Sequence, residues 1–367
     1  MKMKILVLNG GKYSSPEGGV VRFKNLIAKS GKHDVVWVDP IYYRETYDEE
    51  ELEKEKEKNV FVIKGKKASK NRLVELIQRE KHFLKAVKEN DFDVCVFYNA
   101  WGTTLARAEV RRLGKPLVFD YIDLMHAFRK NPFEKHASRF ITKSALRKSD
   151  LIISTATRLF EDASKYDKNV VLIPNGVNVT DFEKAAPKKL LHPCVGFVGG
   201  FGSWVDFDLV LESARLLPHV TFYLVGDGPQ RKSAEAKAKE WGLNNVLFPG
   251  FVAPKNVKDW LAAFDVCLLP FKVNELTAAV SPIKLFEYFS LKKPVVATPT
   301  YEVEKTASEG CLFASSAVEY ASEISRLLDD KALSKKIGEK GYAIAKKHDW
   351  NILGKKFVGE LEKCCRR

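Results

Sequence analysis

Residues 281–298 read SPIKLFEYFSLKKPVVAT, and they predict an amphipathic helix, a short basic turn and a buried strand in that order. Proline is tolerated in the first turn of a helix because it needs no N–H partner there, so Pro282 marks the predicted helix start. Ser281, directly before it, is a suitable N-cap. A helix that leads at once into an apolar strand is typical of α/β folds with parallel strands.

The same helix places a cation and a carboxylate on one face, because Lys284 and Glu287 lie three residues apart. A helix start offers free N–H groups and a positive dipole end to a phosphate, and Lys284 adds a full charge. Glu287, one turn later, is placed to accept hydrogen bonds from ribose hydroxyls. We therefore expect Ser281, Pro282, Ile283, Lys284 and Glu287 to contact a nucleoside diphosphate. The alternative is a capped surface helix with an ordinary Lys–Glu pair.

Apolar, strand-like runs alternate with helical patterns along the whole chain, which predicts parallel strands joined by helices. Six runs fall in each half, so we expect two similar doubly wound α/β domains. The runs cover residues 4–9, 34–39, 92–99, 116–123, 149–155 and 169–175, then 194–200, 220–227, 245–251, 264–271, 293–299 and 310–315.

The domain boundary is expected where FEKAAPKKLLH, residues 182–192, breaks this rhythm with charge and proline. The predicted domains are residues 1–183 and 184–345, followed by a helical segment, 346–367, that returns to the first domain. The Lys- and Glu-rich segment 45–72 is expected to be a solvated helix or a loop.

The composition is that of a globular chain, since 45% of its 367 residues are hydrophobic. No apolar run reaches the roughly 18 residues of a membrane span. The N-terminal sequence MKMKILVLNGG enters a strand and not a signal-peptide core, so we expect a cytoplasmic protein. The six cysteines show no CxxC pair and no histidine at metal-ligand spacing, which predicts reduced thiols and no metal site.

A net charge of +14 favours anionic partners such as nucleotides and phospholipid head groups. Four basic residues recur at every fourth position and form a stripe on one helical face: Lys135, Arg139, Lys143 and Arg147. The stripe, with phenylalanines close by, predicts peripheral contact with the inner face of an anionic membrane; a plain solvated face is the alternative. No nucleic-acid partner is expected, because no recognition motif is present.

Candidate ligand-binding residues follow the predicted strands, at the carboxyl ends where open α/β sheets bind ligands. Gly11 follows the first strand and lets a donor group approach the backbone closely. FDYIDLMHAF places Asp120, Asp123 and His126 after a buried strand. A carboxylate or imidazole there is suited to orient an acceptor hydroxyl or take its proton, so these three are the catalytic candidates, with Asp123 preferred. A helix cap and an ordinary loop histidine are the alternatives.

The second domain repeats this arrangement with more glycine. Glycines follow its first two strands, where they cradle a diphosphate or simply make tight turns. Side chains in the next loops are expected to meet the diphosphate or the base. These donor-binding candidates are Gly199, Gly200, Gly202, Gly226, Arg231, Val252 and Lys255.

In order and spacing, the motifs from about residue 149 to residue 298 resemble those of GT-B glycosyltransferases, specifically the large family 4 of nucleotide-sugar-dependent enzymes. The matching stretches are SDLIISTATRLFEDA, IPNGVNVTDF, GFVGGFGSWVDFDLV, LVGDGP, FPGFVAPKNVKDWLAAFDVCLLPF and SPIKLFEYFSLKKPVVAT. The resemblance implies two Rossmann-like domains facing a cleft, with the donor held by the C-terminal domain and the acceptor by the N-terminal one. It also implies no required metal and a final helix that crosses back to the first domain.

Residue by residue, the resemblance assigns Glu287 to the second glutamate of the family's paired-glutamate motif, which holds the donor ribose. Ala279 stands where the family has its first glutamate. The Arg and Lys of the family's glycine turn are also missing near Gly199. The pattern SPxKxxE of divergent branches assigns Lys284 to the diphosphate, and Glu275 is a candidate replacement for the lost carboxylate.

The sequence therefore predicts a retaining, metal-independent glycosyltransferase that acts on a glycan or lipid-linked acceptor. The expected donor is a UDP-sugar in preference to a GDP-sugar, with no further cofactor. Because of Ala279, the alternative is a catalytically degenerate GT-B protein that binds a nucleotide sugar or a protein partner.

Overall fold

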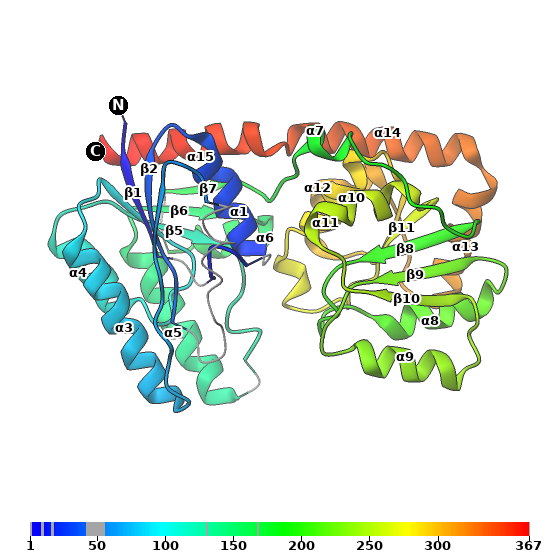
Figure 1. Ribbon diagram of the computed structural model, residues 1–367, viewed down its shortest axis with the longest axis horizontal. Coiled ribbons are helices and arrows are strands. Elements are labelled where there is room, and N and C mark those ends of the chain that lie inside the picture. The colour runs from blue at the N-terminus through cyan, green and yellow to red at the C-terminus, as the bar shows by residue number, and fades with distance from the viewer. Residues whose placement is uncertain are drawn as a thin grey trace. The chain divides into compact units, whose positions relative to one another are not determined.

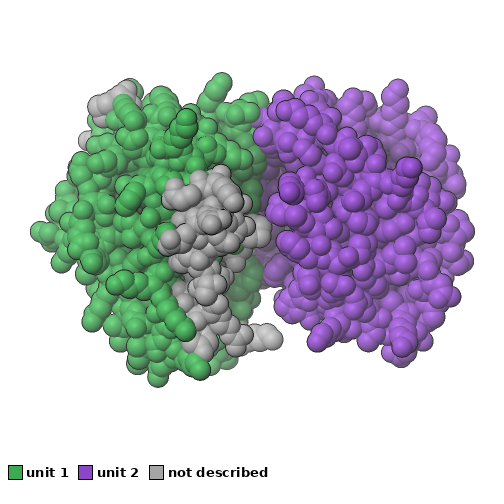
Figure 2. All heavy atoms as spheres, viewed as in Figure 1, with its two compact units in different colours: residues 1–174, 350–367 green, residues 175–349 purple. Residues whose placement is uncertain are grey.

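The structure is a computed structural model that describes residues 2–8, 11–15, 18–41, 56–129, 131–166 and 169–366. The chain divides into two compact units, residues 1–174 with 350–367 and residues 175–349 (Figures 1 and 2). Each unit is built around one parallel sheet with helices packed against it. The predicted α/β fold class is confirmed.

The first unit contains a seven-stranded parallel sheet in the order β3-β2-β1-β4-β5-β6-β7. Leu6 of β1 pairs with Val36 of β2 on one side and with Cys95 of β4 on the other. The strands are β1 Lys4–Leu8, β2 Asp34–Val38, β3 Val60–Ile63, β4 Val94–Phe97, β5 Leu117–Tyr121, β6 Leu151–Ser154 and β7 Val170–Leu172. The helices are α1 Gly18–Leu26, α3 Arg72–Glu89, α4 Thr104–Arg112, α5 Pro132–Lys148, α6 Thr157–Ala163 and α15 Trp350–Cys365, with the 3₁₀ turn η1 Ala28–Ser30.

One strand of this sheet differs from the sequence prediction. β3 lies in the charged segment 45–72, which was expected to be a helix or a loop. Val60 is buried whereas Phe61 is 60% exposed, so this short strand has no regular apolar pattern. It forms because β2 offers its edge, and residues 35–38 of β2 pair with it in parallel register. Residues 42–55 lie outside the described part of the chain.

The second unit contains a six-stranded parallel sheet in the order β10-β9-β8-β11-β12-β13. Its strands are β8 Cys194–Val198, β9 Thr221–Val225, β10 Val246–Gly250, β11 Val266–Leu269, β12 Val295–Ala297 and β13 Cys311–Phe313. Its helices are α7 Val179–Phe182, α8 Phe207–Leu216, α9 Arg231–Glu240, α10 Pro254–Ala263, α11 Ile283–Ser290, α12 Tyr301–Ala307, α13 Ala317–Asp329 and α14 Lys331–Lys347, with the 3₁₀ turns η2 Thr277–Ala279 and η3 Ser308–Gly310. All five residues of β8 are buried, as expected for a central strand covered on both faces.

The second unit begins after Pro174, whereas the sequence placed the junction at residues 183 and 184. Residues 175–183 belong with the second unit because their hydrogen bonds go there. The N–H of Val177 donates to the carbonyl of His348, and the hydroxyl of Tyr342 donates to Glu183 at 2.6 Å. The charge and proline at residues 182–192 therefore mark a surface loop within the second unit. The boundary between the two units is set by the packing of α7.

The last helix, α15, belongs to the first unit. It packs on α1, where Phe357 meets the ring of Phe23 edge-on with centroids 6.5 Å apart. Lys356 Nζ donates to the carbonyl of Leu172 at 2.9 Å, which ties α15 to β7. No helix within the described ranges is long and apolar enough to cross a membrane.

In the second unit, the loops after β8, β9 and β10 are joined backbone to backbone. Gly199 N–H donates to Val225 at 3.0 Å, and Gly226 N–H donates to Gly250 at 2.9 Å. Gly226 has a φ of +141°, and a Cβ atom there would overlap the carbonyl oxygen of Gly199. The three strand ends therefore pack this closely only because position 226 has no side chain.

We expect Gly226→Ala to destabilise the protein by about 3 kcal/mol or more, since it adds an overlap to an unfavourable φ. Gly242→Ala is the control, because Gly242 also has a positive φ but open space around its Cα. That change should cost only about 1 kcal/mol. Chemical denaturation of both variants checks this, and equal losses would show that the close approach at position 226 is not the constraint.

Candidate functional site

The predicted diphosphate-binding helix is α11, and its start differs in detail from the sequence prediction. Pro282 occupies the N-cap position and Ile283 is the first helical residue, with no side-chain cap. Ser281 Oγ instead accepts the N–H of Asn175 at 3.2 Å, and the Ser281 carbonyl accepts from the Asn175 amide at 2.7 Å. Ser281 as N-cap was therefore wrong. The residue fastens the start of α11 to the loop at residue 175.

Lys284 runs from α11 to the end of β8. Its Nζ lies 5.3 Å from the ring centroid of Phe197 and 5.1 Å from that of Phe271. A Cβ atom on Gly199 would lie 2.7 Å from Lys284 Cε, so a side chain at position 199 would displace the lysine head. Within the described residues, this ammonium has no hydrogen bond or ion pair. A half-buried cation thus lies directly at the glycine turn after β8.

Burial shifts both charged groups of this helix toward neutrality. It lowers the pKa of Lys284 to about 8, while the neighbouring carboxylate of Glu287 acts in the opposite direction. Burial also raises the pKa of Glu287 to about 7, against the opposing effect of Lys284. At both residues, the effect of desolvation on the pKa is larger than the effect of the Lys284–Glu287 attraction. An anion bound beside Lys284 would favour the charged form of the lysine. Shifts of this kind at a strand-end loop are typical of ligand sites.

The glycines predicted to bind the donor fall into two groups. Gly200 is exposed with open space at its Cα, so its backbone is accessible to a ligand. Gly226 is buried in the packed loops, and Gly202 is buried with its Cα against the ring of Trp204. The structure thus places Gly199 and Gly200 beside Lys284, whereas Gly202 and Gly226 shape the loops behind them.

The remaining donor candidates lie farther along the loops. Arg231 is already bound to two carboxylates, with Nε 2.7 Å from Glu235 and Nη1 3.6 Å from Asp227. The hydrogen bond to Glu235 raises the pKa of Arg231. Lys255 is exposed in the first turn of α10, and Val252 is half-buried in the loop before it. Arg231 is thus paired with carboxylates, whereas Lys284 and Lys255 form no ion pair within the described residues, and of these two only Lys284 is half-buried.

The position of the missing glutamate is occupied by a buried methyl group. Ala279 ends η2 and is fully buried. The turn is held by Thr277, whose Oγ1 donates to the carbonyl of Lys272 at 2.5 Å. Glu275 is exposed in the segment just before η2. A carboxylate at position 279 would be buried in this backbone arrangement, whereas Glu275 is accessible.

In the first unit, Asp120 and Asp123 have different environments although they are only three residues apart, Asp120 in β5 and Asp123 in the turn after it. Asp120 is fully buried, and Arg22 donates to both of its oxygens, from Nε at 2.8 Å and Nη2 at 3.0 Å. Arg22 Nη1 also donates to the carbonyl of Pro174 at 2.9 Å. Asp120 therefore holds the end of β5 to α1 and the end of the unit, and its oxygens are not available to a substrate.

Asp123 and His126 lie in the turn after β5. Asp123 is half-buried, and burial raises the pKa of its carboxyl to about 7. His126 is buried, and its carbonyl accepts the N–H of Arg129 at 3.1 Å. A carboxyl group with a pKa near neutrality is suited to exchange a proton with an acceptor hydroxyl, so Asp123 is retained as the acid–base candidate. Gly11 is buried in the segment after β1.

The sequence analysis missed a stacked pair beside this turn. The Arg129 guanidinium carbon lies 5.3 Å from the ring centroid of Trp101, in the loop after β4. Arg129 Nε is buried with no hydrogen-bond partner within the described residues. The sequence contains a signal for this pair, because NAWG, residues 99–102, comes at the end of a strand-like apolar run. Loops in that position were already expected to bind ligands.

His192, Cys194 and Asp265 form the one His/Cys/Asp/Glu cluster with metal-ligand spacing among the described residues. Asp265 Oδ2 accepts from the backbone N–H of Cys194 and lies 2.8 Å from His192 Nδ1. Lys293 acts electrostatically on Asp265 and Cys194, which disfavours a bound cation. The cluster lies at the start of β8, away from the glycine turns at its end, and the hydrogen bonds of Asp265 account for it.

Two family models match the chain. Glycosyltransferase Family 4 matches residues 20–181, and Glycosyl transferases group 1 matches residues 192–330. The chain is a family 4-like glycosyltransferase. Among curated relatives, a putative teichuronic acid biosynthesis glycosyltransferase, TuaH of Bacillus subtilis, is 26% identical over 263 residues. The 2-deoxystreptamine glucosyltransferase of Streptomyces kanamyceticus is 29% identical over 164 residues.

The alignment with the Bacillus protein covers 66% of this chain and 66% of that protein. The alignment with the Streptomyces enzyme covers 40% of this chain and 42% of that enzyme. HepE of Anabaena, solved in complex with UDP and glucose, superposes with a TM-score of 0.75 at 17% identity and covers 98% and 100% of the two chains. Sucrose-phosphate synthase from Thermosynechococcus elongatus superposes with a TM-score of 0.78 at 16% identity. The match covers 99% of this chain and 98% of the synthase chain. These likenesses establish the GT-B fold of this glycosyltransferase.

The different roles of the two aspartates predict different responses to substitution. Asp120→Asn leaves Arg22 buried without its counter-charge and should cost about 3 to 5 kcal/mol. Asp123→Asn should not lower the free energy of unfolding at pH 8. The folded protein disfavours the ionised form of this carboxyl group, as its raised pKa shows. Folding raises the pKa of Asp123 from its ordinary value of 3.8 to about 7, so the wild type loses stability relative to Asp123→Asn as the pH rises through this range.

Urea denaturation of both variants at pH 5 and pH 8 measures these changes. A large loss in Asp123→Asn together with a small loss in Asp120→Asn would reverse the assignment.

Proposed function

We propose that this glycosyltransferase transfers a sugar from a UDP-sugar to a glycan or lipid-linked acceptor, with retention of configuration and without a metal. The second unit holds the donor and the first unit the acceptor. The observation that carries the proposal is the Lys284 ammonium, half-buried at the glycine turn after β8 with no carboxylate bound to it.

The donor half of the site follows from the chemistry of the leaving group. When the bond from the anomeric carbon to the diphosphate breaks, negative charge grows on the departing UDP. Lys284 and the free N–H groups at the start of α11 stabilise that charge, as a metal ion does in other transferases. Glu287, one turn along α11, accepts from the ribose hydroxyls. Complexes of HepE with UDP and with UDP-glucose support the choice of nucleotide.

The acceptor half is assigned to the loops after β4 and β5. The acceptor hydroxyl oxygen bonds to the anomeric carbon, and its proton passes to the departing phosphate or to Asp123. Arg129, stacked on Trp101, is placed to bind an anionic group of the acceptor. The name of the Bacillus relative, a putative teichuronic acid biosynthesis enzyme, supports an acceptor on a polysaccharide pathway.

A donor site lacking the first glutamate is also compatible with a protein that binds the nucleotide sugar without turnover. Ala279 favours this alternative, because nothing at that position reaches the transferred sugar. Glu275 is the accessible carboxylate that would restore the contact.

We expect millimolar UDP to raise the melting temperature of the wild type and to have no such effect on Lys284→Met. The affinity of the wild type should fall as the pH rises above about 8, because the free protein then loses the ammonium proton. Lys284→Arg should keep its affinity above pH 8, since arginine stays charged. Thermal shift with UDP, GDP and ADP between pH 6 and pH 10 measures both effects.

Lys255→Met is the matched control, because it removes an exposed lysine near the same loops. If Lys284→Met responds to UDP like the wild type, the diphosphate cation lies elsewhere. Transfer or hydrolysis of the preferred UDP-sugar should disappear in a folded Glu287→Ala variant. UDP binding without any turnover in the wild type would favour the degenerate alternative.

For a lipid-linked acceptor, we propose that α5 docks on an anionic membrane. Its exposed side carries Phe133, Phe140, Lys143 and Arg147, and the two rings are 81% and 75% exposed. We call these four residues the basic-aromatic face. Lys135 and Arg139 are half-buried, so the exposed charge comes from the C-terminal half of the helix. Aromatic rings beside cations are the composition of an interfacial helix.

Removing both cations of this face, Lys143→Gln with Arg147→Gln, should weaken binding to vesicles containing phosphatidylglycerol by about tenfold or more at low salt. Phe133→Ser with Phe140→Ser should weaken it at high salt as well. Lys335→Gln with Lys336→Gln removes the same charge from α14 and is the control. Cosedimentation measures binding, and equal losses in the face and control variants would contradict the proposal.

A further inference from the structure

A second group of cations lines a cavity in the first unit that the transfer reaction does not use. The cavity holds about 290 Å³ between α4 and α5. Three basic residues, Arg107, Arg111 and Lys148, line it together with the hydroxyls of Thr104 and Ser144. Leu117, the first residue of β5, also lines it, so the cavity lies at the amino end of that strand. Asp123 follows the carboxyl end of the same strand.

Arg107 is a buried cation that forms no ion pair within the described residues. Its side chain is 5% exposed, and its Nε is buried with no hydrogen-bond partner within the described residues. Nη2 makes two long contacts, 3.3 Å to the Ala100 carbonyl and 3.4 Å to Thr104 Oγ1, and the guanidinium carbon lies 5.2 Å from the ring centroid of Phe97. Glu80 acts on Arg107 at a distance, but its two oxygens already accept the N–H groups of Thr104 and Leu105. Burial lowers the pKa of Arg107 to about 10.

The other two cations have a simpler explanation that does not extend to Arg107. Arg111 and Lys148 lie in the last turns of α4 and α5, where positive charge offsets the helix dipole. Arg111 Nη1 donates to the Lys148 carbonyl at 2.5 Å, as a C-terminal cation does. Arg107 lies one turn earlier and is buried, so the helix dipole does not explain its charge, and Glu80 and the Phe97 ring offset that charge without an ion pair. A buried guanidinium beside a cavity calls for an anion.

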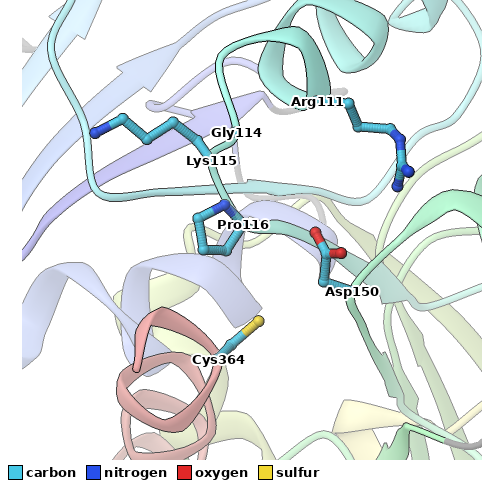
Figure 3. A pocket seen from close by; sticks show the side chains of 6 residues that line it. All are labelled: Arg111, Gly114, Lys115, Pro116, Asp150 and Cys364. Carbon is cyan, nitrogen blue, oxygen red and sulfur yellow. The ribbon is translucent and has the colours of Figure 1, made fainter. Parts of the chain in front are cut away.

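The adjoining cavity does not offer the same environment. It holds about 420 Å³ and shares Arg111, but Asp150 and Cys364 also line it (Figure 3). Lys115 extends away from Arg111 there (Figure 3). One Asp150 oxygen accepts the N–H of Leu117 at 2.8 Å. Among the described residues that line the cavity between α4 and α5, three are cations and none is a carboxylate.

We propose that the cavity between α4 and α5 binds a phosphate group, held by Arg107, Arg111 and Lys148 and by the hydroxyls of Thr104 and Ser144. A guanidinium fork and hydroxyl donors suit the tetrahedral oxygens of a phosphate monoester. The volume fits one small phosphate ester or the phosphate of a larger molecule. The phosphate comes either from a free ester or from a lipid head group. This site is separate from the donor site at Lys284.

Calorimetric titration with sodium phosphate at constant ionic strength tests the site. We expect Arg111→Gln and Lys148→Gln to weaken phosphate binding about tenfold each, because each removes a charge-assisted hydrogen bond. Arg112→Gln is the matched control, since it removes a more exposed charge from the same helix and should leave affinity within about twofold. UDP binding at Lys284 should be unchanged in all three variants, which separates this site from the proposed function.

A second measurement addresses Arg107 itself. Without phosphate, Arg107→Met should melt at or above the wild-type temperature, because it removes a buried charge that forms no ion pair within the described residues. Adding phosphate should raise the melting temperature of the wild type and not that of Arg107→Met. A wild type that neither binds phosphate nor gains stability from it would overturn the proposal, as would unchanged affinity in both Arg111→Gln and Lys148→Gln.

Two further arms identify the source of the phosphate. Weaker binding of Arg111→Gln to phosphatidylcholine vesicles containing phosphatidic acid would indicate a lipid head group. Competition of hexose 1-phosphate with inorganic phosphate, with vesicle binding unchanged, would indicate a free ester. Both results support a phosphate site.

Discussion

The contact between Lys284 and the glycine turn after β8 is the constraint on which the donor site depends. The ammonium reaches the end of β8 only because Gly199 has no side chain. The turn itself is held by the N–H of Gly199 on Val225 and by the packing of Gly226 beneath it. Ser281 fixes the start of α11 through Asn175. Several ordinary hydrogen bonds therefore support one cation that burial makes costly to keep charged.

The first unit shows how burial separates residues that the sequence presents together. Asp120 and Asp123 are three positions apart in FDYIDLMHAF. Asp120 is taken up by Arg22 from α1, whereas Asp123 has a pKa raised by burial alone. Burial raises the pKa of both carboxyl groups, but at Asp120 the Arg22 guanidinium opposes that effect, whereas at Asp123 burial acts alone.

Buried cations recur in this chain, and their partners distinguish their roles. Arg22 is matched by Asp120 and supports the fold. Lys284 lies against aromatic rings at a strand end, and Arg107 lies beside a cavity without a carboxylate. A desolvated charge without an ion pair is unfavourable in the free protein, and this is the basis for the anion sites that we propose at both residues.

The sequence by itself determined the fold class and most of the strands, because parallel strands buried on both faces appear as apolar runs that need no partner to be recognised. It also placed Lys284 and Glu287 on one helix, since the helical period alone brings them together. The strand β3 was missed, because its formation depends on the edge of β2 and not on its own pattern.

Three contacts follow from the tertiary structure alone: Ser281 binds Asn175, Asp120 pairs with Arg22, and Arg107 lies at a cavity without an ion pair among the described residues. Each of these depends on a residue from a distant segment. Desolvation and pairing are set by such neighbours, and no local pattern in the sequence records them.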